Sequence, residues 1–222
     1  MSPLFDSLVL LDDKEPRRAA LNMALDEVLL RRLGTPVLRV YRWISPAVSF
    51  GYFEPFAPVR NLYPALDLVR RWTGGGIVLH GRDFTYSLLV GNDHWMFHAG
   101  PEESYRGVHE AVAAALNSAG VPVTPVCLGR EKVSQSCFEN PVPHDLLLGD
   151  RKIAGAAQRR TKHGLLHQGS IQNIEHPEDL AERLAKALCM HCIDAGISAV
   201  DLGEAEKLEA EKYATDAWTR RL

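Results

Sequence analysis

A run of three glycines after two arginines is the first segment whose residue types could do chemistry. It reads RRWTGGG over residues 70–76. Glycines let the backbone approach a ligand closely and turn N–H groups toward an anion, and arginines pair with phosphate or carboxylate groups. The segment lacks the Gly-Lys-Ser/Thr ending of a P-loop, and Leu79 stands where a dinucleotide loop needs its third glycine. The alternative is a glycine-rich turn beside solvated arginines.

A lysine beside small residues forms the second candidate segment. Lys152 begins the run KIAGAAQRR over residues 152–160. Small neighbours leave room for a flat or long ligand to lie against a strand, and a lysine there can hold a carboxylate, a phosphate oxygen or a developing oxyanion. A surface lysine on a strand is the alternative.

The elements expected around these segments determine how they are positioned. Apolar spacing predicts helices over about 18–33, 104–119 and 177–190, the last beginning with Pro177, and a final helix in the tail from residue 204. Strands are expected at 37–43 and 46–53, on both sides of the glycine run and of the turn at 81–83, around a hairpin at 149–150, and after a turn at 162–164. Residues 121–143 show no regular pattern. Hairpin-linked strands with inserted helices indicate an α+β fold with a largely antiparallel or mixed sheet flanked by helices.

Length and composition narrow the class of protein. The chain has 222 residues, 46% of them apolar, which suits one domain, and its net charge of −3 argues against a nucleic-acid binder. The sequence shows no basic leader and no apolar run long enough to cross a membrane. We therefore expect a cytoplasmic protein with reduced cysteines. Cys189 and Cys192 supply only two ligands, so packing at a helix end explains them better than zinc, and no metal site is expected.

The two candidate segments together resemble the lipoate-protein ligase and octanoyltransferase family, whose catalytic domain is related to that of biotin protein ligases. The family patterns R-R-x-[ST]-G-G-G-x-[VA]-x-H, K-[IVF]-[SA]-G-x-A-Q and H-x-G-[ST] stand here as RRWTGGGIVLH, KIAGAAQ and HQGS. LNMALDE and RWISPAVSFG are similar to the family's opening helix and strand. The resemblance covers residues 20–174, roughly, with a weaker similarity near Tyr213 and Trp218. It implies one biotin/lipoate protein ligase-like catalytic domain over 1–222, without a C-terminal accessory domain.

The resemblance also implies roles for individual residues. Lys152 would contact the acyl carbonyl and, in a ligase, the adenylate phosphate. The substrate-binding residues implied are Arg71, Thr73, Gly74, Gly75, Gly76, His80, Gly155, Ala156, His167, Gly169 and Ser170. The arginine and the glycine run would line the acyl carboxyl or phosphate end, while the histidines and the HQGS segment would flank the pocket. Tyr41, Trp43 and Val48 are apolar enough to wall the alkyl chain, although core packing explains them equally well.

One branch of octanoyltransferases has a nucleophilic cysteine in the loop ahead of the lysine, and Cys137 lies 15 residues before Lys152. In that branch a thiolate attacks the octanoyl thioester of acyl-carrier protein, and the carrier lysine resolves the acyl-enzyme. A cationic lysine nearby would lower the pKa of the thiol. The following PVPHDLL lacks the aromatic residue expected in that branch, and a buried structural cysteine is the alternative.

The resemblance therefore predicts an enzyme that transfers an octanoyl or lipoyl group to a lysine of a lipoyl-carrier domain. An octanoyl-acyl-carrier-protein:protein octanoyltransferase without a cofactor is favoured, with acyl-carrier protein as donor. An ATP-dependent lipoate-protein ligase, which would need ATP and Mg²⁺ and in some cases a partner protein, is the first alternative. A non-catalytic ligand-binding relative and a biotin protein ligase are the others. No nucleic acid or membrane partner is expected.

Overall fold

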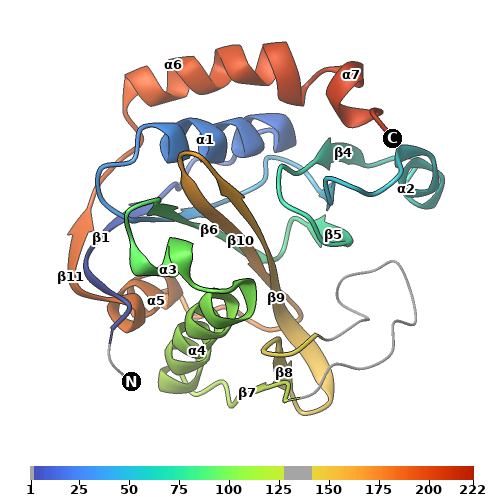
Figure 1. The fold of residues 1–222 in the computed structure, drawn as a ribbon. Coiled ribbons are helices and arrows are strands. Elements are labelled where there is room, and N and C mark those ends of the chain that lie inside the picture. Colours follow the sequence, from blue (N-terminus) through green and yellow to red (C-terminus); the bar gives the residue numbers. More distant parts are fainter. Residues whose placement is uncertain (1–2, 128–141) are drawn as a thin grey trace.

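A mixed eight-stranded sheet forms the centre of the structure, a computed structural model that describes residues 3–127 and 142–222 (Figure 1). Its strand order is β11-β1-β2-β6-β10-β9-β8-β7. β1 runs parallel to both of its neighbours, and the other adjacent pairs are antiparallel. The strands are β1 Phe5–Asp12, β2 Val37–Tyr41, β6 Phe84–Gly91, β7 Thr124–Pro125, β8 Leu146–Leu148, β9 Arg151–Thr161, β10 Gly164–Ile171 and β11 Cys189–Asp194. The expected α+β fold with a largely antiparallel, mixed sheet is confirmed.

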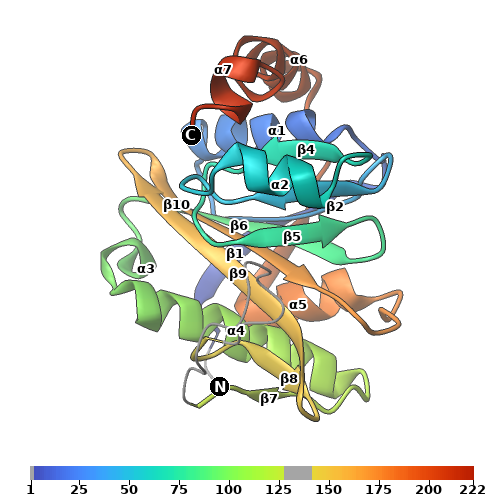
Figure 2. The ribbon, with the colours of Figure 1, turned by 90° about the vertical axis from the view of Figure 1, so that its right-hand side faces the viewer.

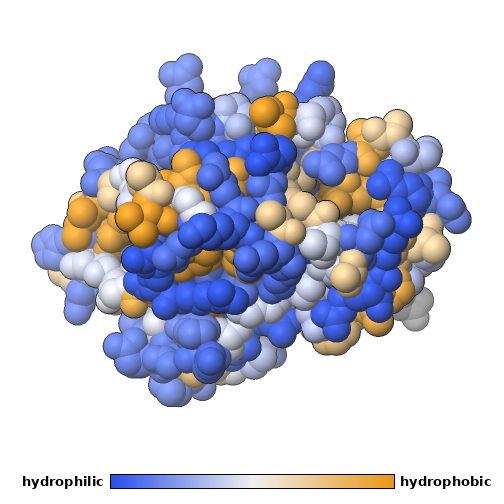
Figure 3. Space-filling view, turned by 90° about the horizontal axis from the view of Figure 1, so that it is seen from above, coloured by the Kyte–Doolittle hydropathy of each residue, from blue (hydrophilic) through white to orange (hydrophobic). Residues whose placement is uncertain are grey.

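Helices cover both faces of this sheet (Figure 1). α4 and α5 pack together on one face, and α1 and α6 lie on the other. The helices are α1 Ala19–Arg31, α2 Phe56–Leu62, α3 Trp95–His98, α4 Pro101–Ser118, α5 Leu180–Leu188, α6 Ala199–Leu208 and α7 Asp216–Thr219, with a π-helical turn at Glu209–Tyr213 between the last two. None of the helices in the described ranges is long and apolar enough to cross a membrane. Viewed over α6, hydrophilic side chains cover much of the surface, with smaller hydrophobic patches between them (Figure 3).

A smaller sheet holds the glycine run (Figure 2). It has the order β4-β3-β5, with β3 Ala47–Phe50, β4 Asp67–Arg70 and β5 Ile77–His80. The glycine run connects β4 to β5 and folds back over the end of β3. A Cβ on Gly51 would lie 1.8 Å from the carbonyl oxygen of Gly75, so this close approach requires glycine. Gly75 itself has φ of +82°, a conformation that side chains rarely adopt.

A buried polar network joins α1 to the sheet. Eleven of the thirteen residues of α1 are buried, because the helix lies between the sheet and α6, so its polar residues need buried partners. Asp26 accepts from Arg39 on β2 at 2.9 Å, from Ser87 on β6 at 2.5 Å and from Gln168 on β10 at 2.8 Å. Gln168 in turn accepts from Thr73 in the glycine run at 2.7 Å. One carboxylate thus links α1, three strands and the glycine run.

Three expectations from the sequence need correction. The helix expected over 177–190 is shorter, because the chain from Cys189 onward pairs with β1 as the edge strand β11. Cys189 and Cys192 therefore lie on a strand rather than at a helix end, the first buried and the second exposed. The tail is two helices joined by the π-helical turn, since Thr215 caps a new helix at Asp216. β1 and α2 were not anticipated.

Arg70 fastens the C-terminal segment to the smaller sheet. Its side chain is fully buried, and its guanidinium donates to the carbonyl oxygens of Tyr52, Glu54, Trp218 and Thr219 among others. The Trp218 indole returns a hydrogen bond to the Arg70 carbonyl at 3.0 Å. The alternative interpretation of the sequence, in which Arg70 is exposed to solvent, is therefore wrong, because its side chain is buried.

We predict that Arg70→Ala lowers the free energy of unfolding by about 3 kcal/mol, because several buried carbonyl groups lose their donor. Arg60→Ala is the matched control, since Arg60 also donates to backbone carbonyls but is only half-buried, and it should cost below about 1 kcal/mol. Urea unfolding measures both variants. Equal losses in the two would contradict the anchoring role.

A neutral histidine lies in the core between α4 and the sheet. The His109 ring is 1% exposed, and its Nδ1 donates to the carbonyl oxygen of His144 at 2.8 Å. Within the described ranges its Nε2 has no hydrogen-bond partner, so a proton there would be buried and unsatisfied. Burial lowers the pKa of His109 to about 4, although the charge of Asp145 and the His144 carbonyl oppose the shift.

This depressed pKa gives a prediction for stability against pH. The unfolded chain binds a proton at His109 near pH 6.5, while the folded chain binds it only near pH 4. The contribution of His109 to the free energy of unfolding is therefore complete above pH 6.5 and is lost as the pH falls to 4. We expect a loss of about 3 kcal/mol across that range. His109→Leu should flatten the dependence measured by urea unfolding, whereas exposed His98→Leu should not. An unchanged slope in His109→Leu would refute the assignment.

Candidate active site

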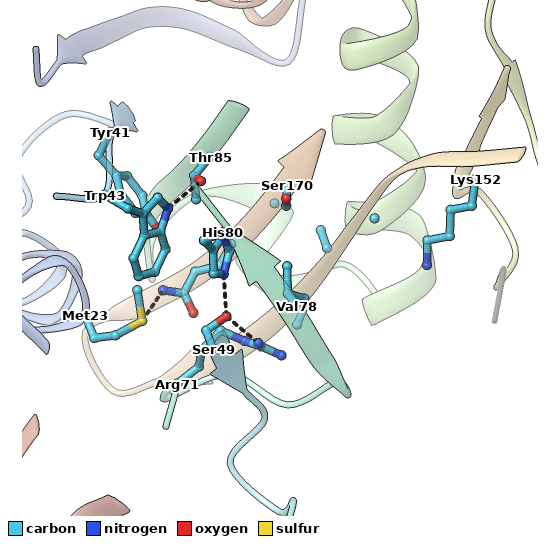
Figure 4. A pocket seen from close by; sticks show the side chains of 15 residues that line it. Met23, Tyr41, Trp43, Ser49, Arg71, Val78, His80, Thr85, Lys152 and Ser170 are labelled. Carbon is cyan, nitrogen blue, oxygen red and sulfur yellow. Dashed lines mark hydrogen bonds between the residues drawn. The ribbon is translucent and has the colours of Figure 1, made fainter. Parts of the chain in front are cut away.

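A narrow pocket lies between the two sheets (Figure 4). It encloses about 460 Å³ of empty space, part of it open to solvent. Its lining residues come from α1, from the strands of both sheets and from the segments next to them: Met23, Tyr41, Trp43, Ser49, Arg71, Val78, His80, Thr85, Lys152, Gly155, Ala156, Ala157, Gln168, Gly169 and Ser170. Figure 4 shows the aromatic side chains and Met23 at one end and Lys152 apart from them at the other.

Aromatic rings and a thioether form the inner end. The Trp43 ring stacks on His80 with centroids 4.0 Å apart, and its indole N–H donates to Thr85 at 2.8 Å. Met23 lies next to Tyr41 and Trp43, and its flexible side chain can adapt to an apolar ligand. Val48, expected from the sequence as a possible wall, packs instead in the core of the smaller sheet. The inner end is therefore suited to an alkyl chain.

A hydrogen-bonded chain of polar groups supports one wall of the pocket. Arg71 donates to Ser49 Oγ at 2.7 Å, Ser49 contacts His80 Nε2 at 2.6 Å, and His80 Nδ1 contacts Asp83 at 2.8 Å. Burial opposes ionisation of Asp83, but His80, with hydrogen bonds from Thr85 and Ser170, outweighs it and lowers the pKa of Asp83 to about 2. An ionised carboxylate thus fixes the orientation of the His80 ring.

Arg71 also determines the shape of the glycine run. It is 5% exposed, and its second terminal nitrogen donates to the carbonyl oxygens of Gly74 and Gly76, both at 2.9 Å. Binding two carbonyls of one loop fixes its backbone, which isolated glycines could not do themselves. The solvated-arginine alternative is therefore wrong for Arg71 as well, because the side chain is buried.

Lys152 is a buried cation with a buried carboxylate beside it. Its side chain is 4% exposed, and its Nζ lies 2.6 Å from Asp145 Oδ2. Asp145 is fully buried and also accepts from the Tyr105 hydroxyl at 2.5 Å and from the Val142 backbone N–H at 2.7 Å. Removing a buried ammonium from water is costly, and a carboxylate at ion-pair distance offsets part of that cost. The surface-lysine alternative does not apply.

Two glycines make room for neighbouring side chains. A Cβ on Gly155 would lie 2.7 Å from Lys152 Cε and 2.9 Å from its Nζ, so the lysine side chain crosses directly over this glycine. A Cβ on Gly169 would lie 2.2 Å from the ring of Tyr86. The Ala156 backbone N–H donates to the Tyr105 hydroxyl at 2.9 Å, which ties β9 to the partner of Asp145. Small residues around Lys152 thus serve its position as well as ligand access.

The structure brings together most of the site residues expected from the sequence. The pocket is lined by seven of them: Arg71, His80, Lys152, Gly155, Ala156, Gly169 and Ser170. Gly74 and Gly75 line an adjoining groove, the Gly76 carbonyl is bound by Arg71, and Thr73 donates to Gln168. These placements leave the roles themselves as predictions.

One expected residue lies away from the pocket, and another cannot be compared. His167 is fully buried and contacts Tyr86, Tyr105 and His109 rather than the pocket. Burial lowers its pKa well below the usual value, so its ring is neutral. Cys137 lies outside the described residues. The described parts of the chain hold no cluster of three or more metal-binding side chains.

Sequence reasoning missed the groups that support the site. Asp145 and Tyr105 hold Lys152, while Ser49 and Asp83 hold Arg71 and His80. One signal was present: Asp145 directly precedes β8, the hairpin partner of the strand that carries Lys152. An acidic residue at that place is the expected partner for a buried lysine.

Comparison with known proteins identifies the family of the chain. The model of the lipoyl protein ligase A/B catalytic domain matches residues 18–186. The octanoyltransferase LipM of Moorella thermoacetica is 37% identical over 172 residues, covering 72% of this chain and 63% of that protein. LipM of Oceanobacillus iheyensis is 36% identical over 183 residues, covering 76% of this chain and 66% of that protein. The chain thus matches slightly less than two thirds of the length of these relatives.

Solved structures show the same fold. A T. acidophilum protein with bound lipoic acid superposes with a TM-score of 0.76 at 24% identity, covering 98% of this chain and 99% of that one. Lipoate-protein ligase A bound with ATP gives a TM-score of 0.75 at 22% identity, covering 97% and 98%. The family model over residues 18–186 and the similarity to the LipM proteins show that the chain belongs to the lipoyl protein ligase A/B catalytic domain family.

Proposed function

We propose that this protein transfers an octanoyl group from a thioester donor to a lysine of a lipoyl-carrier domain. The observation that carries the proposal is the pocket itself, which has an apolar inner end and a buried cation, Lys152, at its other end. A medium-length acyl chain fits such a pocket with its carbonyl toward the lysine. The LipM relatives named as octanoyltransferases support this choice of acyl group.

Lys152 is proposed to stabilise the negative charge that develops on the acyl carbonyl oxygen. A preorganised cation in a dry site can supply several kcal/mol of such stabilisation. Asp145 and Tyr105 hold the ammonium in place before the substrate arrives, so little reorganisation is needed during the reaction. Cys137 is proposed as the nucleophile that first takes the acyl group, with acyl-carrier protein as the donor.

An ATP-dependent lipoate-protein ligase is the second candidate. A buried lysine beside a glycine run suits an adenylate phosphate as well as an acyl carbonyl, so Lys152 and Arg71 fit this chemistry too. That reaction would require ATP and Mg²⁺, whereas the transferase requires no cofactor. In both, the acceptor is a lysine of a lipoyl-carrier domain.

Removal of the lysine tests the site. We predict that Lys152→Ala lowers octanoyl transfer to a lipoyl domain by about 10²–10³-fold, because the developing oxyanion loses its cation. Lys162→Ala, at the exposed turn that follows the same strand, is the matched control and should keep full activity. Circular dichroism verifies that both variants fold. Near-normal transfer by Lys152→Ala would rule out this assignment.

The acyl donor separates the two candidates. If Cys137 is the nucleophile, octanoyl-acyl-carrier protein should leave an octanoyl adduct on the wild type that hydroxylamine removes and that Cys137→Ser lacks. A ligase would instead use lipoate with Mg-ATP and would retain that activity in Cys137→Ser, because an adenylate needs no protein nucleophile. Intact-mass spectrometry after incubation with each donor makes the distinction. A wild type without an adduct, active only with ATP, would replace the transferase by the ligase.

A further inference from the structure

A groove adjoins the pocket, and Ala156 and Ala157 line both. Its other walls include Gly75 of the glycine run and Glu102 in the first turn of α4. It is broader than the pocket, with about 890 Å³ of empty space against about 460 Å³. A group that entered through this groove would therefore reach the part of β9 that lies beside Lys152.

The charge of the groove favours a cation. Of the described residues that line it, Glu102 is the one with a full charge of fixed sign, and none is a lysine or arginine. A polyphosphate would enter with nothing of opposite charge along these walls, whereas the ammonium group of a lysine would meet a carboxylate. The glycine and alanine walls leave room for the four methylene groups of a lysine side chain.

His144 holds an unusual position on this groove. Its φ is +72°, a conformation rare for residues other than glycine and asparagine. Both of its backbone groups are bound, since its N–H donates to Val126 and its carbonyl accepts from His109, each at 2.8 Å. Its ring Nε2 lies 3.3 Å from a Glu102 carboxylate oxygen. In the tautomer that donates from Nε2 to this carboxylate, Nδ1 carries the lone pair that can accept a proton.

An acyl transfer to lysine needs such a proton acceptor. The amine of a free lysine is protonated at neutral pH, with a pKa of about 10.4, and has no lone pair with which to attack a carbonyl carbon. Lys152 and Arg71 at the pocket are cations, and Asp145 is engaged with Lys152. The His144 imidazole lines the groove through which the amine would come, and imidazole is a common general base in catalysis.

We propose that the groove admits the acceptor lysine of the carrier domain and that His144, oriented by Glu102, is the base that deprotonates it; this rests on the proposed transferase function. His144 takes one proton from the ammonium and passes it to solvent. The amine attacks the carbonyl carbon, the C–N bond forms and the C–S bond of the thioester breaks. The leaving thiolate takes the second proton from nitrogen, which leaves the amide N–H.

The test compares two nucleophiles in one variant. His144→Asn keeps a residue that tolerates positive φ but removes the base. We expect it to lower octanoyl transfer from the thioester donor to a lipoyl domain by about 10²-fold. Hydroxylamine is largely unprotonated at neutral pH, so its octanoylation by the same variant should stay within about threefold of wild type, and added imidazole should partly restore transfer to lysine.

A pair of neighbouring glutamates provides the control. Glu102→Gln should lower lysine octanoylation by roughly tenfold, because the ring loses its orienting carboxylate, while Glu103→Gln, exposed in the same helical turn and not on the groove, should not. Equal loss with both nucleophiles in His144→Asn, or loss with neither, would overturn the assignment of the base. A wild type that transfers nothing from the thioester would instead overturn the proposed function.

Discussion

The burial of one ammonium group places the strongest constraint on the site. Lys152 lies buried between the sheets with Asp145 2.6 Å from it, and Asp145 is itself held by a hydroxyl and a backbone N–H. The buried position of the lysine explains why residue 155 is glycine, since the lysine side chain passes over it. It also explains Tyr105, whose hydroxyl donates to Asp145 and accepts a hydrogen bond from the Ala156 backbone N–H. The cation, its partner and the strand that carries it form one unit.

The opposite end of the pocket depends on a second carboxylate that never reaches the cavity wall. Asp26 binds side chains from β2, β6 and β10, and through Gln168 it reaches Thr73 of the glycine run. The glycine run is therefore held from two directions, by this network and by the Arg71 contacts with its carbonyl groups. Buried polar hydrogen bonds therefore fix the backbone of this loop.

The sequence predicted the local elements and motifs of the fold better than the contacts between distant segments. The α1 and α4 helices, the β8–β9 hairpin and the chemistry-bearing segments follow from spacing and motif, and the pocket contains the predicted Arg71, His80 and Lys152. β1 escaped notice because it forms no hairpin: β2 and β11 both run parallel to it and are separated from it in sequence by at least one helix. The acidic partners of the site lie close in sequence to the residues they hold, but they escaped notice because an ion pair between two side chains leaves no periodic signal.

The Arg70 anchor has a consequence for how the C-terminal segment can vary. Its guanidinium binds main-chain oxygens of Trp218 and Thr219, which any pair of residues would present in the same way. Substitutions of Thr219 that preserve the helical backbone should leave these bonds intact, whereas Trp218 also contributes its indole hydrogen bond to the Arg70 carbonyl. Hydrogen bonds to main-chain oxygens thus hold the segment in place while leaving the side chain at position 219 open to change.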